Sequence, residues 1–174
     1  MSAQEQAVDD TMNFDECMLF AKDHPICAFT TIDGDQPRVR MFGMWFADEE
    51  GFYFSTFKVK DVYRQLRENA KVELCFYAPP AGALASMLQS KQLYAHRDGP
   101  LGEGGTIDLG KAMRASGNVV FLDDPKLKER LLEERPFLRH NVENIVLFRV
   151  EKGEAWFWTF ADSGRESAIE RIKF

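Results

Sequence analysis

The chain has 174 residues, a formal net charge of -6 and a pI near 5.2, which favours one domain over residues 1–174 and disfavours binding to nucleic acid or to anionic membranes. Hydrophobic residues make up 45% of the sequence, with 15 phenylalanines, so the chain has enough apolar material for a core.

The cysteines and the N-terminal segment favour a reducing, cytoplasmic location. Cys17, Cys27 and Cys75 show no CxxC spacing, which disfavours a disulfide framework or a zinc ribbon. The first residues, MSAQEQAVDD, are polar and acidic, unlike a signal peptide. No apolar run approaches the roughly 20 residues that span a bilayer.

The first third of the chain predicts a helix followed by a β-hairpin. The helix begins after Asn13, a good N-cap, and ends at His24-Pro25. Two β-rich runs, 26–32 and 37–46, flank the turn sequence DGDQ, and Asp-Gly between such runs is a strong hairpin signal. Further elements are predicted in order: a strand over 52–57, a short helix over 60–68 and a strand over 71–77.

Residues 78–111 interrupt this pattern and are predicted to form an insertion. ALASMLQSKQLY favours a short helix, and the following HRDGPLGEGGTIDLG has five glycines in fifteen residues. A long loop of this kind in a compact domain is usually functional or mobile. This insertion carries Met87, Tyr94 and His96.

The last third predicts strands around one more helix. A strand over 113–122 precedes a helix that begins at Asp124-Pro125 and ends near Arg135. ENIVLFRVEK and GEAWFWTF are predicted to pair as a hairpin around Lys152-Gly153. Six or seven mostly antiparallel strands with three short helices favour a mainly β fold, an antiparallel barrel that leaves no sheet edge exposed.

A cationic and hydroxylic group of residues is the candidate binding site. Arg38 and Arg40 alternate with Val39 and Met41, so both arginines face the side of the strand that also carries the apolar Phe42, Met44 and Phe46. A guanidinium can stack on a planar ring while it donates hydrogen bonds to anionic oxygen.

The second half of this candidate site is the junction between the 52–57 strand and the next helix. Ser55, Thr56, Lys58 and Lys60 lie directly before the helix start, and hydroxyls, ammonium groups and free backbone N–H groups together favour phosphate. The alternative is a solvated barrel rim with ordinary surface lysines, and spacing alone leaves both interpretations open.

Other chemistry finds little support in the sequence. His24, His96 and His140 are scattered, and no metal-binding, nucleophile or dinucleotide motif is present. The cysteines lie on core patterns, where buried thiols are inert.

Taken together, the segments QPRVRMFG, GFYFST, KVKDVYRQLRENAKVELCF, MRASGNVVFLDDPKLKERLLEERPFL and the closing IERIKF resemble the pyridoxamine 5'-phosphate oxidase-like family of FMN-binding split barrels. The resemblance covers about residues 14–77 and 112–174. It implies a six-stranded antiparallel split β-barrel with peripheral short helices that works as a homodimer, with FMN in clefts between the subunits.

The resemblance also implies roles for individual residues. Arg40 matches the arginine beside the flavin, and Met41, Phe42 and Gly43 match the run that lines the ring. Ser55 and Thr56 match the strand-end positions near the ribityl chain and the phosphate, and Lys60 with Lys58 matches the phosphate-binding group at the helix start. Arg38 and Arg114 are further, weaker matches to cofactor-binding positions.

Two departures separate this chain from the oxidase itself. Lys60-Asp61-Val62 stands where the oxidase has Ser-Arg-Lys, so Asp61 must either face the phosphate or cap the helix. The C-terminal substrate-binding pattern of the oxidase is not evident in ESAIERIKF. We therefore expect an FMN-dependent oxidoreductase that acts on a small molecule other than vitamin B6. The alternatives are a non-catalytic flavin carrier, store or redox sensor, and a relative that binds haem or deazaflavin.

Overall fold

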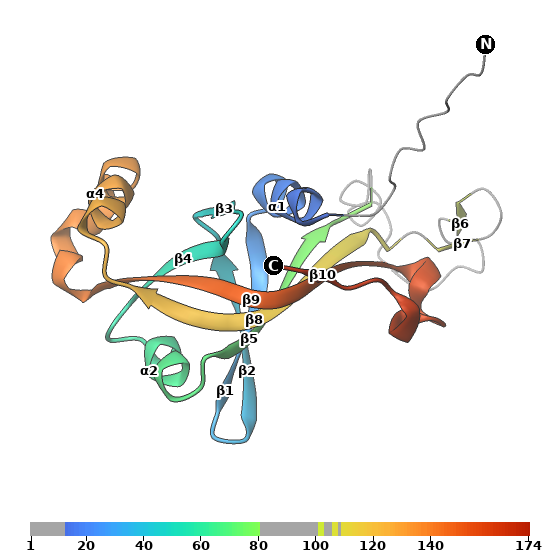
Figure 1. The fold of residues 1–174 in the computed structure, drawn as a ribbon, viewed down its shortest axis with the longest axis horizontal. Coiled ribbons are helices and arrows are strands. Elements are labelled where there is room, and N and C mark those ends of the chain that lie inside the picture. The colour runs from blue at the N-terminus through green and yellow to red at the C-terminus, as the bar shows by residue number, and fades with distance from the viewer. Residues whose placement is uncertain (1–12, 81–100, 103–105, 108) are drawn as a thin grey trace, which may run out of the picture.

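The computed structural model describes residues 13–80, 101–102, 106–107 and 109–174, and Figure 1 shows a strongly twisted antiparallel sheet with helices around it. The strands are β1 (Ile26–Asp33), β2 (Gln36–Gly43), β3 (Phe46–Asp48), β4 (Gly51–Phe57), β5 (Lys71–Ala78), β6 (Leu101–Gly102), β7 (Thr106–Ile107), β8 (Lys111–Leu122), β9 (Ile145–Thr159) and β10 (Ile172–Lys173). The helices are α1 (Phe14–Asp23), α2 (Asp61–Glu68) and α4 (Pro125–Glu134), with 3-10 segments η1 (Pro136–Asn144), η2 (Phe160–Asp162) and η3 (Glu166–Ala168).

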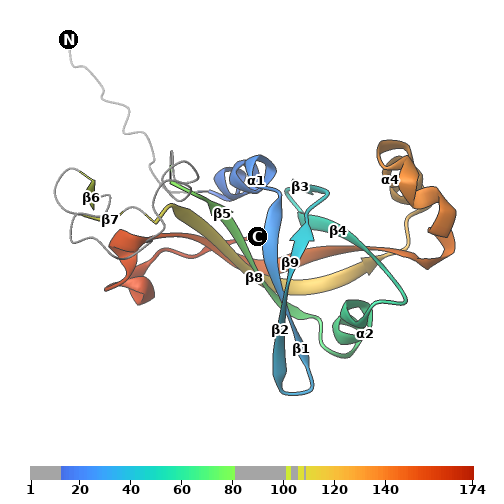
Figure 2. The same ribbon diagram turned by 180° about the vertical axis from the view of Figure 1, so that it is seen from behind.

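The main sheet has eight strands in the order β2-β1-β5-β8-β9-β4-β3, with β10 beside β9. In both views β8 and β9 form a long ribbon, α4 lies at one end of it, and α1 and α2 lie on opposite sides of it (Figures 1 and 2). The β1–β2 hairpin projects beside α2. The predicted mainly β antiparallel architecture is therefore confirmed.

The predicted closed barrel of six strands is not found, because the described sheet has eight strands and its path is open between β2 and β3. The reason lies in the run 37–46, which was expected to be one strand. The run breaks at Met44 and Trp45, where the Met44 N–H donates to Pro25 O and the Trp45 N–H to Tyr53 O, each at 2.8 Å. The chain thus passes from one edge of the sheet to the other.

The predicted hairpin at Lys152-Gly153 is also wrong, because β9 continues through both residues. Ser116 lies opposite Glu154 whereas Asn118 lies opposite Glu151, so β9 carries one extra residue at this point. Lys152 absorbs this β-bulge with a φ of 52°. A Cβ on Gly153 would lie 1.7 Å from Ser116 O, so only glycine fits there.

The core is built mainly from phenylalanines of the strands. Phe29, Phe54 and Phe148 are fully buried, and the ring of Phe29 meets those of Phe54 and Phe148 edge-on at centroid distances of 5.3 and 5.9 Å. Helix α1 closes this core with the buried Cys17 and Ala21. A second cluster around Leu131 and Leu147 attaches α4 to the far end of the ribbon.

Several local signals act as the sequence predicts. The Asn13 side chain accepts from the Glu16 N–H, and the Asp124 side chain accepts from two N–H groups at the start of α4. The predicted helix over 83–94, like Met87, Tyr94 and His96, lies outside the described residues. None of the helices in the described ranges is long and apolar enough to cross a membrane.

Candidate functional site

A cavity of about 560 Å³ lies between the β1–β2 hairpin and the start of α2. It brings together five of the ten predicted cofactor-binding residues. These five are Arg38, Arg40, Met41, Phe42 and Lys60, and the other lining residues are Asp33, Asp61, Val62 and Gln65. Pockets for small ligands commonly have volumes of about 300–1,000 Å³, so a cofactor-sized molecule fits this cavity.

The register of the β1–β2 hairpin sets the direction of the two arginines. Arg38 pairs with Thr31, Arg40 with Phe29 and Phe42 with Cys27. Residues directly opposite each other in an antiparallel pair share a face, and Thr31, Phe29 and Cys27 are all completely buried. The prediction that Arg38, Arg40 and Phe42 share one face is therefore confirmed, whereas Met44 and Phe46, expected on the same face, lie beyond the end of β2.

Arg40 is held in place by two neutral side chains. Its Nη1 donates to Thr31 Oγ1 at 2.8 Å, and its Nη2 donates to the side-chain oxygen of Gln65 at 2.7 Å. The Thr31 hydroxyl in turn donates to the same Gln65 oxygen at 2.6 Å. Because Thr31 and Gln65 are buried, this three-residue network fixes the guanidinium relative to both β1 and α2.

The charge of Arg40 is only indirectly balanced. Burial holds the pKa of the Arg40 guanidinium below its ordinary value, attraction by Asp61 and Asp33 opposes that shift, and repulsion by Arg38 adds to it. Within the described part of the chain, no carboxylate lies within salt-bridge distance of Arg40. A half-buried cation with neutral partners favours the approach of an anion.

Helix α2 supplies the opposite wall of the cavity. Lys60 is its N-cap residue without a side-chain capping bond, and its ammonium group lies 5.3 Å from the ring centroid of Phe57. Asp61 and Val62 follow in the first turn, and Gln65 lies one turn further on the same face. The free N–H groups of this first turn add a partial positive charge to that of Lys60.

Asp33 is the second carboxylate of the cavity, and its charge is already compensated. Arg64 Nη2 donates to it at 2.9 Å, Gln65 Nε2 donates at 3.2 Å, and Arg38 Nε lies 3.7 Å away. These contacts, the Arg64 hydrogen bond first, hold the pKa of Asp33 below its ordinary value although burial acts against them. Asp33 therefore acts as a structural anchor for the cations around it.

Five predicted residues do not line the cavity: Gly43, Ser55, Thr56, Lys58 and Arg114. Thr56 is 3% exposed, and its hydroxyl has no hydrogen-bond partner in the described residues. Ser55 lies on the face of β4 opposite to that of Thr56, because side chains alternate along a strand. Lys58 is exposed, with its backbone N–H bound to Asn144 O at 2.8 Å.

Arg114 lies on the other face of the sheet from Arg40. It pairs with Cys75 across β8 and β5, and its guanidinium donates to Glu73 and, at 2.7 Å, to Glu166. It also lies 4.9 Å from the ring centroid of Trp156. Both carboxylate partners compensate its charge, so within one chain Arg114 is not a member of the site.

Three residues of the site were not predicted from the sequence: Thr31, Asp33 and Gln65. Thr31 could have been found from the hairpin register, because a turn at Gly34 places it opposite Arg38. Gln65 follows Asp61 by four residues, the spacing that puts two side chains on one helix face. No sequence signal links Asp33 to Arg64, because that contact depends on how α2 packs against β1.

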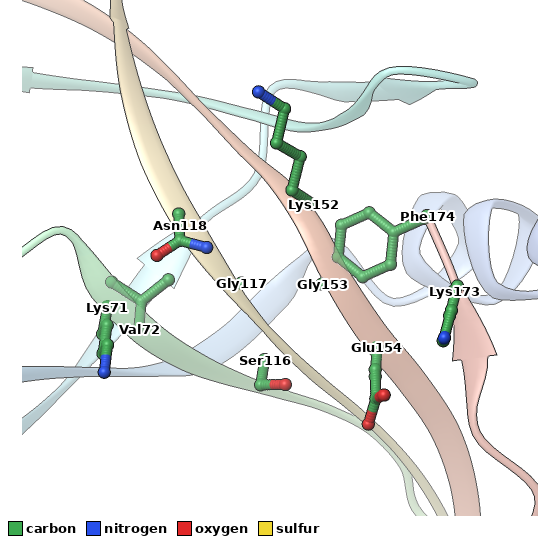
Figure 3. Close-up of a pocket in the computed structure, with 10 residues that line it drawn as sticks. All are labelled: Lys71, Val72, Ser116, Gly117, Asn118, Lys152, Gly153, Glu154, Lys173 and Phe174. Atoms are coloured by element: carbon green, nitrogen blue, oxygen red, sulfur yellow. The ribbon is translucent and has the colours of Figure 1, made fainter.

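A second hollow of about 590 Å³ lies at the β-bulge of β8 and β9 (Figure 3). Lys71, Lys152 and Lys173 line it, but Figure 3 shows the Lys152 ammonium pointing away from the other two. Diverging ammonium groups do not form an anion site, and none of the predicted site residues lies there.

Metal and haem ligands gain no support from the described residues. Within the described ranges, no three His, Cys, Asp or Glu side chains gather where they could hold a metal ion. Neither His24 nor His140 lines the cavity, and His96 lies outside the described residues. Burial raises the pKa of the Cys17 thiol to about 11 and that of Cys27 to about 12, as expected for inert thiols.

The fold and the site thus define a class: a mainly β protein with an open antiparallel sheet and a cationic cavity between a β-hairpin and a helix start. The family model described as pyridoxamine 5'-phosphate oxidase matches residues 14–158. The chain therefore belongs to the pyridoxamine 5'-phosphate oxidase-like family. No curated protein matches it.

Solved structures with the same fold include proteins of different kinds. A NimC/NimA family protein from Clostridium acetobutylicum is 25% identical with a TM-score of 0.58, over 84% of this chain and 85% of that one. HutZ, the haem storage protein from Vibrio cholerae, is 15% identical with a TM-score of 0.53, over 85% and 95%. PhzG from Burkholderia lata, solved with tetrahydrophenazine-1-carboxylic acid, is 15% identical with a TM-score of 0.56, over 87% and 82%.

Proposed function

We propose that this protein binds FMN in the cavity between β2 and α2 and acts as an oxidoreductase on a small molecule. The observation that carries the proposal is the Arg40 guanidinium, which neutral Thr31 and Gln65 hold at the cavity without a carboxylate partner in the described residues. Membership of the pyridoxamine 5'-phosphate oxidase-like family, in which flavin is a common ligand, supports it.

The geometry favours the phosphate end of FMN for all three cations. Arg38, Arg40 and Lys60 line one cavity at the start of α2, where helix N–H groups also attract an anion. This position differs from the ring-side position that the family resemblance implies for Arg40. The buried Thr56 hydroxyl also lacks a partner in the described residues, but Thr56 does not line this cavity, so it is not counted among the phosphate contacts.

The flavin ring would lie along β2. This strand is at the open edge of the sheet and pairs only with β1, so half of its backbone N–H and C=O groups lack a ladder partner in the described structure. Met41 and Phe42 line the cavity, and Phe42 is anchored by rings of Phe29, Phe54 and Phe148. An edge strand of this kind can offer hydrogen bonds to the polar edge of a ring.

A second copy of the chain is the proposed partner. Ile26, Val39 and Met41 share the outer face of the β1–β2 hairpin, and these residues are 57%, 65% and 68% exposed. Exposed apolar patches mark interaction sites, and Met41 belongs both to this patch and to the cavity. A homodimer through this face would place the cofactor beside the interface.

The bound flavin would supply hydride or electron transfer, and the protein would supply position and access. Arg38, Arg40 and Lys60 would neutralise the phosphate, and Asp33 would hold Arg38 through its own ion pair. The network through Gln65 would keep Arg40 in place without a competing carboxylate. An acid–base pair is not required for hydride transfer to a flavin.

The absorbance spectrum of the purified protein tests the cofactor. We expect a yellow protein that releases FMN on denaturation, or a colourless one that takes up added FMN. A protein that ignores added FMN would overturn the proposal. A Soret band that remains after dialysis would favour a haem-binding protein instead.

Anaerobic reduction separates an enzyme from a carrier, store or sensor. NADH or NADPH is added to the FMN-loaded protein while the flavin absorbance is followed, and small-molecule acceptors are then supplied. Rapid bleaching followed by turnover supports the oxidoreductase. If neither donor nor any other reductant of similar potential bleaches the flavin, the result favours a flavin store or sensor.

A further inference from the structure

Asp61 is the one carboxylate of the cavity whose side chain has no hydrogen bond or ion pair in the described structure. It is exposed at the first position of α2, directly after Lys60. The other carboxylate, Asp33, is bound by Arg64 and Gln65 and lies 3.7 Å from Arg38. The two carboxylates of the cavity therefore have different electrostatic effects on a ligand.

The charge of Asp61 reaches the cation that is central to the site. Asp61 attracts Arg40 across the cavity and is the largest favourable influence on its charged form. No hydrogen bond joins the two in the described structure, so this is attraction between separate groups that share one space. An anion that enters the cavity competes with Asp61 for Arg40.

We propose that Asp61 is a specificity-determining residue that weakens the binding of a phosphate dianion, so that the cavity distinguishes FMN from riboflavin less than its cations alone would. This inference rests on the proposed function. It concerns the phosphate end only, because riboflavin carries the same ring and ribityl chain without the phosphate.

The expected size follows from Coulomb's law in a solvent-facing cavity. Repulsion between one carboxylate and a nearby phosphate in such a setting changes affinity on the order of tenfold at moderate ionic strength. Added salt screens this repulsion, so the effect of Asp61 shrinks as ionic strength rises. The affinity for a neutral ligand does not depend on this repulsion.

Asp61 also lies where an acidic residue stabilises a helix. A carboxylate in the first turn interacts favourably with the helix dipole, so its replacement slightly destabilises α2. The stability of each ligand-free variant is therefore measured beside its affinity, so that a binding change is not confused with loss of the helix.

The experiment compares FMN and riboflavin affinities, by flavin fluorescence, for the wild type, Asp61→Asn and Asp61→Ala. Asp61→Asn keeps the shape of the side chain, and Asp61→Ala excludes a new hydrogen bond from the amide as the cause. The matched control is Glu129→Gln, which removes the same unit of charge from an exposed position on α4. All titrations are repeated at high salt.

The proposal expects both Asp61 variants to bind FMN about tenfold more tightly at low salt, with riboflavin affinity unchanged and with no effect of Glu129→Gln. Unchanged FMN affinity in both variants, equal changes for FMN and riboflavin, or weaker FMN binding would overturn it. If the wild type binds neither flavin, the proposed function itself fails and this inference falls with it. If the wild type binds flavin but the Asp61 variants do not bind FMN more tightly, only this inference is overturned and the proposed function stands.

Discussion

Arg40 on β2 donates a hydrogen bond to the side-chain oxygen of Gln65 on α2, at 2.7 Å. The same oxygen accepts from Thr31 on β1, so three elements that are separate in the sequence meet at one buried acceptor. This contact turns an ordinary strand-to-helix junction into a cavity wall with a fixed cation.

Gln65→Leu removes this acceptor and leaves Arg40 and Thr31 with donors that lack a partner. We expect the free energy of unfolding to fall by about 1–3 kcal/mol, because a buried donor without an acceptor loses its solvation without compensation. Chemical denaturation measures the change. Arg67→Ala is the control, because it removes an exposed side chain of the same helix that makes no ion pair in the described structure. A Gln65→Leu variant as stable as this control contradicts the expectation.

The hydroxyls of Thr56 and Thr31 differ in their partners, and the same substitution at both positions exposes that difference. Thr31→Val breaks the bonds to Arg40 and Gln65 and should cost about 1–3 kcal/mol. Thr56→Val removes a buried hydroxyl without a partner in the described residues, so ligand-free stability should stay within about 1 kcal/mol or rise. If FMN uses the Thr56 hydroxyl, Thr56→Val also weakens FMN binding, whereas a large loss of ligand-free stability shows that the hydroxyl already has a partner.

Arg40→Ala and Lys60→Ala test the cationic wall in different ways. Arg40→Ala should weaken FMN binding by about tenfold to a hundredfold, the usual worth of hydrogen bonds to a charged group. Lys60→Ala should weaken FMN binding by about three- to tenfold and leave riboflavin nearly unaffected, because an exposed ammonium acts through charge alone. Fluorescence titration measures both, and Lys126→Ala on α4 is the control. Equal losses of FMN and riboflavin in Lys60→Ala would show that Lys60 does not contact the phosphate.

Much of the fold could be predicted because the deciding signals are local. Asn13 and Asp124-Pro125 fix helix starts through hydrogen bonds within a few residues, and Asp33-Gly34 fixes a hairpin whose Gly34 has a φ of 67°. Lys152-Gly153 gives the same local signal as a turn. Whether such a pair becomes a turn or a bulge depends on β8, a strand more than thirty residues away, and the sequence does not show that.

The candidate site was predictable for similar reasons and with similar gaps. Alternation along QPRVRMFG placed Arg38, Arg40 and Phe42 on one face, and the helix-start pattern marked Lys60 as a candidate, which lines the same cavity. The sequence could not show which of Ser55 and Thr56 is buried, and it could not exclude Arg114 from the cavity. Strand pairing decides which face of the sheet each side chain occupies. Thr31 and Gln65 meet Arg40 only through the packing of α2 on β1.

The ionised side chain of Asp33 makes the stability of the fold depend on pH. The Arg64 hydrogen bond, with help from Gln65 and Arg38, lowers the pKa of Asp33 in the folded state below that of the unfolded chain, which is about 3.9. A lowered carboxyl pKa stabilises the fold above the unfolded value, and this contribution is lost as the pH falls through the folded value. Thermal unfolding should therefore show Asp33→Asn less stable than wild type at neutral pH, with the difference shrinking below about pH 4. Asp35→Asn, in the same turn, is the control, and a constant difference at every pH contradicts the assignment.

Val39 tests the proposed dimer. It lies at the outer face of β2 with 65% of its surface exposed, and it does not line the cavity. If this face joins two copies, Val39→Glu buries a carboxylate on each side of the interface, and a buried charge without a partner prevents association. We expect the wild type to have twice the 20.0 kDa chain mass by light scattering and Val39→Glu to have the mass of one chain. Val59→Glu is the matched control, because Val59 is 76% exposed in the turn before α2 and belongs to a different surface. A monomeric wild type, or loss of the dimer in both variants, would refute this face as the interface. If Val39→Glu alone loses both the dimer and FMN binding, the cofactor lies between the two copies.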